Sequence, residues 1–236
     1  MLVPHFLLIA LAVAVAACVQ GTVGIGFALI VAPVLAFLSP QLLPASLLLL
    51  MLPLNLYTML RERHAFDWKG AGWITLGRTF GTFAGAAVLV ALPAHALSLL
   101  VGGATIAAAL ATMFAPAFSP NRRAFVTVGL VTAISETATG IGGPPLALAY
   151  QHQQPPVLRS TVAGCFLLGE LFSLGVLAAM GRTTSQQLLW AALLVPFLAI
   201  GGFLSSLLHH KLNARLLRSF VLLFAVISGA ILIVRA

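Results

Sequence analysis

A glycine-rich break, Thr139-Gly140-Ile141-Gly142-Gly143-Pro144-Pro145, lies inside a long apolar run, and a similar break, Thr22-Val23-Gly24-Ile25-Gly26-Phe27, lies about 115 residues earlier. After each break the chain continues with further apolar segments in a similar order. Interruptions at corresponding places in two halves are typical of secondary transporters that bind their substrate between two repeats, near the middle of the bilayer. The two breaks therefore predict both the fold and the place of a binding site.

The composition predicts an integral membrane protein. Hydrophobic residues make up 61% of the 236 residues and charged residues 7%, whereas a soluble domain has roughly 25% charged residues. The net charge is +8, but the basic residues lie in short gaps between apolar runs. That pattern orients a protein in a membrane, so we expect lipid and no nucleic acid as a partner.

The apolar segments predict an all-α fold of two repeats, residues 1–118 and 119–236, with four helical segments each. The segments cover residues 6–38, 42–60, 70–91, 95–115, 124–150, 157–179, 187–208 and 215–234. Most are close to the roughly 20 residues that cross a bilayer. The first segment of each repeat is too long for one crossing, and its break leaves pieces of about 7–15 residues. We expect each broken segment to dip into the membrane and return.

The distribution of basic residues supports this returning geometry. If both broken segments return to the side where they start, nine basic residues gather on one side, namely Arg61, Arg63, Lys69, Arg122, Arg123, Arg159, Lys211, Arg215 and Arg218. Only Arg182 and Arg235 remain on the other side, whereas single crossings would divide the same residues seven to four. Basic residues concentrate on the cytoplasmic side. We therefore expect two inverted repeats with both termini outside the cytoplasm, although two short crossings per broken segment would give the same distribution.

Four polar residues within the apolar segments are candidates for function. Glu136 directly precedes the second break, Glu170 lies midway along 157–179, and Arg78 lies inside 70–91. An ionisable group at such depth costs roughly 2.5–3.5 kcal/mol and marks a functional site by default. Asn55 follows Ser46 by the same nine residues that separate Glu170 from Thr161. We expect Arg78 to attract an anion, Asn55 to contact it, and Glu170 or Glu136 to carry a proton; a purely structural ion pair is the alternative.

The breaks themselves predict how an anion is held with few charges. Helices that begin near Phe27 and Gly143 would point free N–H groups and the positive end of the helix dipole at the middle of the membrane. Glycine lets the backbone approach a ligand closely, and threonine hydroxyls add donors. The predicted contacts in the breaks are Thr22, Gly24, Gly26, Phe27, Thr139, Gly140, Gly142 and Gly143.

Enzymatic chemistry is not predicted from this sequence. Ser135 beside Glu136 is the one candidate nucleophile in a membrane segment, and no His or Lys is placed at the same depth to activate it. The sequence has no HExxH motif, no P-loop and no Cys/His cluster. We therefore expect no enzyme activity, no metal and no cofactor.

Several of these motifs together resemble the sulfite exporter TauE/SafE family of bacterial transporters, over nearly the whole chain. The residues that carry the resemblance are Gly24-Ile25-Gly26 with Pro33, Gly140-Ile141-Gly142-Gly143-Pro144, Ala45-Ser46, Ser160-Thr161, Asn55, Asp67-Trp68 and the glycine-rich stretch 196–202. Phe27 stands where a third glycine is common in the family, and Glu170 stands where the second repeat often has Asn. Both departures concern the expected substrate site.

The resemblance implies transport of a small anion, sulfite or an organosulfonate, typically outward across the bacterial cytoplasmic membrane. In that setting both termini are expected in the periplasm. An anion channel with the same midplane site is the alternative function, and a homodimer is one assembly that the sequence leaves open.

Overall fold

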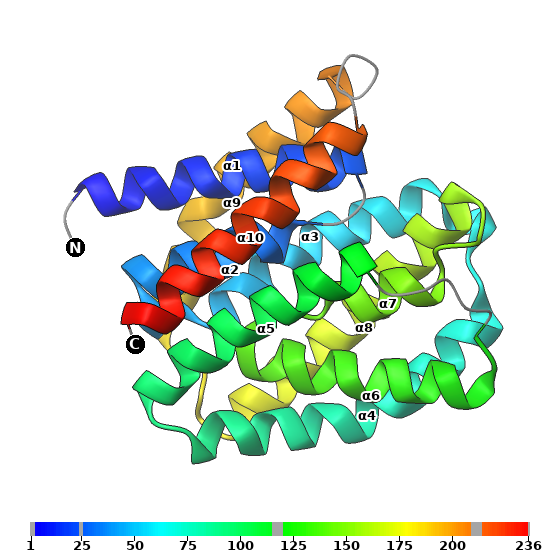
Figure 1. Ribbon diagram of the computed structural model, residues 1–236, viewed down its shortest axis with the longest axis horizontal. Coiled ribbons are helices and arrows are strands. Elements are labelled where there is room, and N and C mark those ends of the chain that lie inside the picture. Colours follow the sequence, from blue (N-terminus) through cyan, green and yellow to red (C-terminus); the bar gives the residue numbers. More distant parts are fainter. Residues whose placement is uncertain (1–2, 24–25, 115–119, 209–213, 236) are drawn as a thin grey trace.

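The computed structural model describes the chain apart from residues 1–2, 24–25, 115–119, 209–213 and 236 (Figure 1). The described residues form ten α-helices, two short 3-10 helices and no strand, so the predicted all-α class is confirmed. The α-helices are α1 (Val3–Val23), α2 (Phe27–Leu38), α3 (Ala45–Arg61), α4 (Trp68–Ala91), α5 (Ala94–Phe114), α6 (Arg122–Thr139), α7 (Gly143–Ala149), α8 (Pro155–Ala179), α9 (Ser185–Leu208) and α10 (Ala214–Arg235). The 3-10 helices are η1 (Pro40–Leu42) and η2 (Arg63–Ala65).

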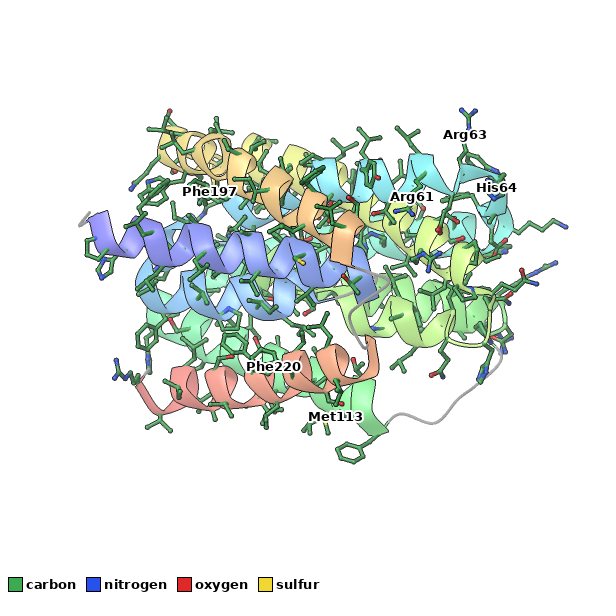
Figure 2. All side chains as sticks on the ribbon, turned by 90° about the horizontal axis from the view of Figure 1, so that it is seen from above. Arg61, Arg63, His64, Met113, Phe197 and Phe220 are labelled. Atoms are coloured by element: carbon green, nitrogen blue, oxygen red, sulfur yellow. The ribbon has the colours of Figure 1, made fainter. Side chains whose placement is uncertain are left out.

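Length and composition make this a multi-pass membrane protein. Five helices in the described part of the chain are long and apolar enough to cross a bilayer: α1, α4, α5, α8 and α9. Large apolar side chains cover the outside of the bundle, among them Met113 and Phe220, which project from its surface (Figure 2). A surface of this kind is stable in lipid and not in water.

Both predicted breaks separate two helices. α1 ends at Val23 and α2 begins at Phe27, while α6 ends at Thr139 and α7 begins at Gly143. The prediction that new helices begin near Phe27 and Gly143 is therefore confirmed. Gly26 has φ 126° and Gly140 has φ 80°, and such positive φ angles favour glycine because it has no Cβ to clash with the backbone.

The first helix of each broken pair is longer than predicted. α1 has 21 residues and α6 has 18, where the sequence interpretation expects pieces of about 7–15 residues. Near the first break, Thr22 remains inside α1, where its hydroxyl donates to the carbonyl of Cys18. At the other end of α6, the side chain of Asn121 accepts from the N–H of Ala124 and starts the helix before the apolar run.

Each broken pair returns to the end of the bundle where it starts. α1 begins and α10 ends at one end of the bundle (Figure 1). α2 ends there too, because the Arg235 guanidinium lies over the Phe37 ring at 4.8 Å. α6 and α7 both have their outer ends at the opposite end: Arg122 lies over the ring of Trp73, and Tyr150 donates to Asp67 in the loop between α3 and α4. Arg63 and His64 mark this loop end in Figure 2.

Glycines bring two helix pairs into backbone contact. A Cβ added at Gly77, Gly81 or Gly85 of α4 would meet backbone carbonyl oxygens of α6. In the same way, a Cβ added at Gly201 of α9 would meet the carbonyl of Ala14 in α1. α4 therefore packs closely on α6, and α1 on α9, while α3 packs on α8 and α5 on α10.

Candidate functional site

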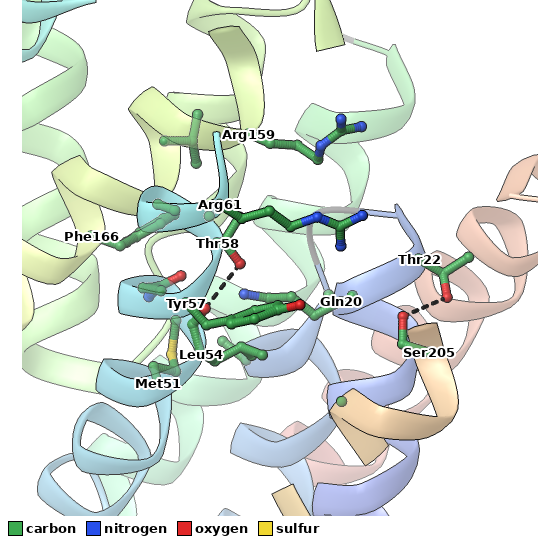
Figure 3. A pocket seen from close by; sticks show the side chains of 18 of the residues that line it. Gln20, Thr22, Met51, Leu54, Tyr57, Thr58, Arg61, Arg159, Phe166 and Ser205 are labelled. Carbon is green, nitrogen blue, oxygen red and sulfur yellow. Dashed lines mark hydrogen bonds between the residues drawn. The ribbon is translucent and has the colours of Figure 1, made fainter. Parts of the chain in front are cut away.

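A cavity of about 330 Å³ lies between the two glycine breaks and the loop end of the bundle (Figure 3). Gly26, Ile141 and Gly143 bring both breaks to its wall, and Arg61, Glu62 and Arg159 line it near the loop end. The side chains of its polar lining residues come from α1, α3, α8 and α9: Gln20, Thr22, Asn55, Tyr57, Thr58, Ser205 and Ser206, with the three charged residues just named. The cavity thus has polar side chains among apolar ones, and it is charged at the loop end.

Gln20 closes the start of α2 at the first break. Its Oε1 accepts a hydrogen bond from the backbone N–H of Phe27 at 2.9 Å, and Phe27 itself is fully buried. The first N–H groups of a helix have no partner within the helix. An oxygen therefore already occupies the position in which an anion would accept from this helix start.

Thr22 points from α1 toward α9, away from Gln20 (Figure 3). Its hydroxyl donates to the carbonyl of Cys18 at 2.8 Å, and its oxygen lies 3.2 Å from the hydroxyl of Ser205 on α9 (Figure 3). Two hydroxyls that share a hydrogen bond can reorient toward a ligand at little cost, because a hydroxyl both donates and accepts. This wall therefore offers donors from two helices.

The second break is tied together by its own hydroxyls. The Thr139 hydroxyl donates to the carbonyl of Ser135 at 2.7 Å and accepts from the N–H of Ile141 at 3.2 Å. The Ser135 hydroxyl donates in turn to the carbonyl of Ile141. These hydrogen bonds stabilise the turn at Gly140, so the hydroxyls of Ser135 and Thr139 have a structural role within the break.

A buried polar cluster lies behind this cavity wall. Arg78 of α4 forms an ion pair with Glu136 of α6, with Nη2 and Oε2 2.5 Å apart. Asn55 of α3 donates through Nδ2 to Oε1 of Glu170 on α8 at 2.7 Å. All four side chains are at most 2% exposed. One cation and two carboxyl groups thus share a site that water does not reach from outside.

Two residues connect the cluster with the cavity. Phe166 lines the cavity, and its ring centroid lies 5.7 Å from Cζ of Arg78. Asn55 also lines the cavity while it donates to Glu170. The absence of a side chain at Gly169 makes room for the Arg78 guanidinium, which a Cβ there would overlap. The side-chain amide of Asn55 therefore links the cavity directly to Glu170.

Comparison with models of known protein families matches residues 9–232 to the family described as sulfite exporter TauE/SafE. The chain belongs to this family. Comparisons with curated proteins and with solved structures found no match. The match covers both predicted repeats, so it confirms the resemblance read from the glycine breaks. The description of TauE/SafE is that of an exporter family, and this protein is accordingly a membrane transporter.

The TauE/SafE site residues expected from the sequence fall into two groups. Thr22, Gly26, Asn55 and Gly143 line the cavity. The lining does not include the other described candidates, which lie within the breaks or in the buried cluster: Phe27, Arg78, Glu136, Thr139, Gly140, Gly142 and Glu170. Gly24 lies outside the described residues. The role of each in binding stays a prediction.

Sequence reasoning missed several residues of this TauE/SafE cavity. Gln20 precedes Gly24 by four residues, as Glu136 precedes Gly140, and this shared spacing could have identified it. Arg61 and Arg159 were counted only as charges that orient the protein. Ser205 and Ser206 had no signal, because serines in an apolar helix are common and the position of Ser205 depends on how α9 packs on α1.

Proposed function

We propose that the protein is a secondary transporter that exports a small oxyanion, sulfite or an organosulfonate, across the bacterial cytoplasmic membrane. The observation that carries this proposal is the cavity that reaches both glycine breaks and has Arg61 and Arg159 at its loop end. N–H and O–H groups that donate to an oxyanion form charge-assisted hydrogen bonds, which are roughly twice as strong as neutral ones. Gln20, Asn55, Thr22 and Ser205 supply such donors.

The position of the charged lining residues supports loading from the cytoplasm. The loop end carries Arg61, Arg63, Arg122 and Arg159, and in membrane proteins such basic loops face the cytoplasm. Arg159 is held by Glu62 through Nε and Nη2. Cations around an opening raise the local concentration of anions. These features support loading of the cavity from the cytoplasmic side.

Hydrogen bonds join α9 to η1 and α3 at the opposite end of the bundle. The side-chain amide of Gln187, at the start of α9, donates to the backbone carbonyl of Gln41 at 2.9 Å. The backbone carbonyl of Gln187 accepts from the hydroxyl of Ser46 at 3.0 Å. Alternating access exposes a site to one side of the membrane at a time, whereas an open channel needs a continuous path to both sides. Saturable flux through proteoliposomes supports the transporter; flux that rises with voltage and does not saturate supports the channel.

Residues 1–118 and 119–236 are proposed to be inverted repeats. The packing supports this, because exchanging each helix for its counterpart leaves the neighbours unchanged: α1 on α9 becomes α6 on α4, while α3 on α8 and α5 on α10 remain the same. The broken pairs also start and return at opposite ends of the bundle. Under this scheme Gln20 and Glu136 are counterparts, and so are Asn55 and Glu170.

The repeat scheme makes a prediction for membrane topology. Reporter fusions after residue 235 and before residue 3 are expected to give periplasmic signals, and an insertion in the η2 loop near Arg63 a cytoplasmic one, because the basic loops stay inside. Cytoplasmic signals from either terminus would contradict the proposed orientation.

Proton coupling is proposed for the buried cluster. Two carboxyl groups, Glu136 and Glu170, share one guanidinium, and electrostatic interactions link Glu170 with both Glu136 and Arg78. A buried charge without a partner is unfavourable, so the second carboxyl group gains stability by taking up a proton. Asn55 donates to Glu170 and also lines the cavity, which supports a proton exchange close to the anion site.

A thermal-shift screen tests the proposed substrate and the cavity together. Sulfite, sulfoacetate, taurine, sulfate and simple carboxylates are added to the detergent-purified protein, and stabilisation by a sulfur oxyanion over carboxylates is expected. Asn55→Leu and Gln20→Leu should weaken binding of the stabilising anion about 10- to 100-fold, since each removes a hydrogen-bonding group from the site. Gln153→Leu is the matched control, because Gln153 is an exposed amide outside the cavity. If both cavity variants bind as the wild type does, the anion is bound elsewhere.

A further inference from the structure

An apolar groove lies at the end of the bundle that carries both termini, far from the loop end. Its lining residues come from α1, α2 and α10, which pack against one another (Figure 1). The volume of the groove is about 330 Å³. Its walls include Leu8 and Ala12 of α1, Val34 of α2 and Ile231 of α10. The one polar lining residue, Ser228, donates its hydroxyl to the carbonyl of Phe224 in its own helix. The groove therefore fits a hydrocarbon chain and offers nothing to a polar ligand.

A cation stands at the outer end of this groove. Arg235 lies in the last turn of α10, and its guanidinium stacks over the ring of Phe37, which lines the groove. The contact holds an otherwise flexible side chain at one place. Arg235 is exposed, so its N–H donors can reach a group at the membrane surface.

No acidic side chain is left to neutralise Arg235. The sequence has four acids, and all of them have other partners in the described structure. Glu62 pairs with Arg159, Glu136 pairs with Arg78, Glu170 accepts from Asn55, and Asp67 caps α4. An anion for Arg235 must therefore come from outside these side chains.

We propose that the groove binds one phospholipid, with an acyl chain between α1, α2 and α10 and the phosphate on Arg235. The groove faces the surroundings of the bundle, and for a membrane protein these are lipid tails at the depth of Leu8 and Val34 and phosphates at the depth of the helix end. The charge of Arg235 and the apolar walls thus match the two parts of a phospholipid in the right order. Arginine also suits phosphate because its planar fork donates two hydrogen bonds at once.

This lipid site is independent of the transported anion. The substrate cavity has several polar and charged side chains in its lining, lies toward the other end of the bundle and shares no lining residue with the groove. The bound lipid would support α2, which has only 12 residues and packs between α1 and α10. Loss of the lipid is thus expected to affect the stability of the first break before it affects anion recognition.

Native mass spectrometry of the detergent-purified protein titrated with phosphatidylglycerol tests the proposal. Arg235→Gln is expected to lower the affinity of the first bound lipid about fivefold, the effect of one basic residue on binding to anionic lipid. Ala12→Phe fills the groove without touching the charge and is expected to lower it as well. Arg182→Gln is the matched control, because Arg182 is the other basic residue at this end and lies in the loop between α8 and α9.

The two variants and the control decide the question together. Wild-type lipid affinity in both Arg235→Gln and Ala12→Phe would overturn the proposal. An equal loss in Arg182→Gln would also overturn it, because general attraction of anionic lipid would then explain the result. Binding of phosphatidylglycerol but not of diacylglycerol, which lacks the phosphate, supports the assigned role of Arg235. Thermal unfolding of each variant without lipid separates a lost lipid site from a misfolded protein.

Discussion

Arg78→Ala is expected to lower stability by about 3–5 kcal/mol and to abolish transport, because Glu136 would remain buried without its cation. Removing one partner of a buried ion pair is far more harmful than removing both. Thermal unfolding of the purified protein measures the first effect, and uptake into proteoliposomes measures the second. An unchanged melting temperature would contradict the ion pair.

The double variant Arg78→Met with Glu136→Gln separates a structural role from a functional one. It removes both charges at similar volume, so most of the lost stability is expected to return. If the pair only holds α4 to α6, transport returns as well. If Arg78 or Glu136 takes part in anion or proton movement, the double variant is stable and inactive, and this is the outcome that we expect.

Glu170→Gln is expected to retain anion binding and to remove its dependence on pH. In the wild type, an ionised Glu170 lies one amide away from the cavity and repels an anion bound there. Two like charges about 6 Å apart at an effective dielectric constant of about 20 change affinity on the order of 100-fold. Anion affinity should therefore rise as the pH falls and Glu170 takes up a proton, whereas the variant should bind tightly at every pH.

The measurement for Glu170→Gln is the dissociation constant of the anion between about pH 5 and 8, the range in which most native proteins keep their stability. Asn55→Asp is the informative companion, because it places a second carboxyl group beside Glu170 and should steepen the pH dependence. If Glu170→Gln keeps the wild-type pH dependence, the proton is carried elsewhere, and Glu136→Gln becomes the next variant to test.

The breaks could be predicted from the sequence because glycine, proline and the ends of apolar runs are local signals. Gly140 and Gly26 adopt angles that other residues avoid, and α2 and α7 begin at the predicted positions. The burial of Arg78, Glu136 and Glu170 could also be predicted from their depth in apolar segments. These features depend on short stretches of chain and on the thickness of the membrane.

The pairing inside the cluster could not be predicted, because it depends on how helices rotate against one another. Arg78 meets Glu136 because Gly77 and Gly81 let α4 approach the backbone of α6. Glu170 meets Asn55 because α8 packs on α3. The role of Gln20 could not be predicted for a related reason. Its side chain accepts from the N–H of Phe27 only when the chain folds back at the first break.

The glycine contacts determine which parts of the molecule can move as units. Backbones that touch without side chains between them cannot slide far, because every shift opens gaps or creates overlap. α4 with α6 and α1 with α9 are such pairs, and each joins a helix from residues 1–118 to a helix from residues 119–236. A conformational change that exposes the site to the other side would therefore move two mixed bodies past each other instead of one half against the other. The boundary between them runs along α3 and α8, where Asn55 bonds to Glu170.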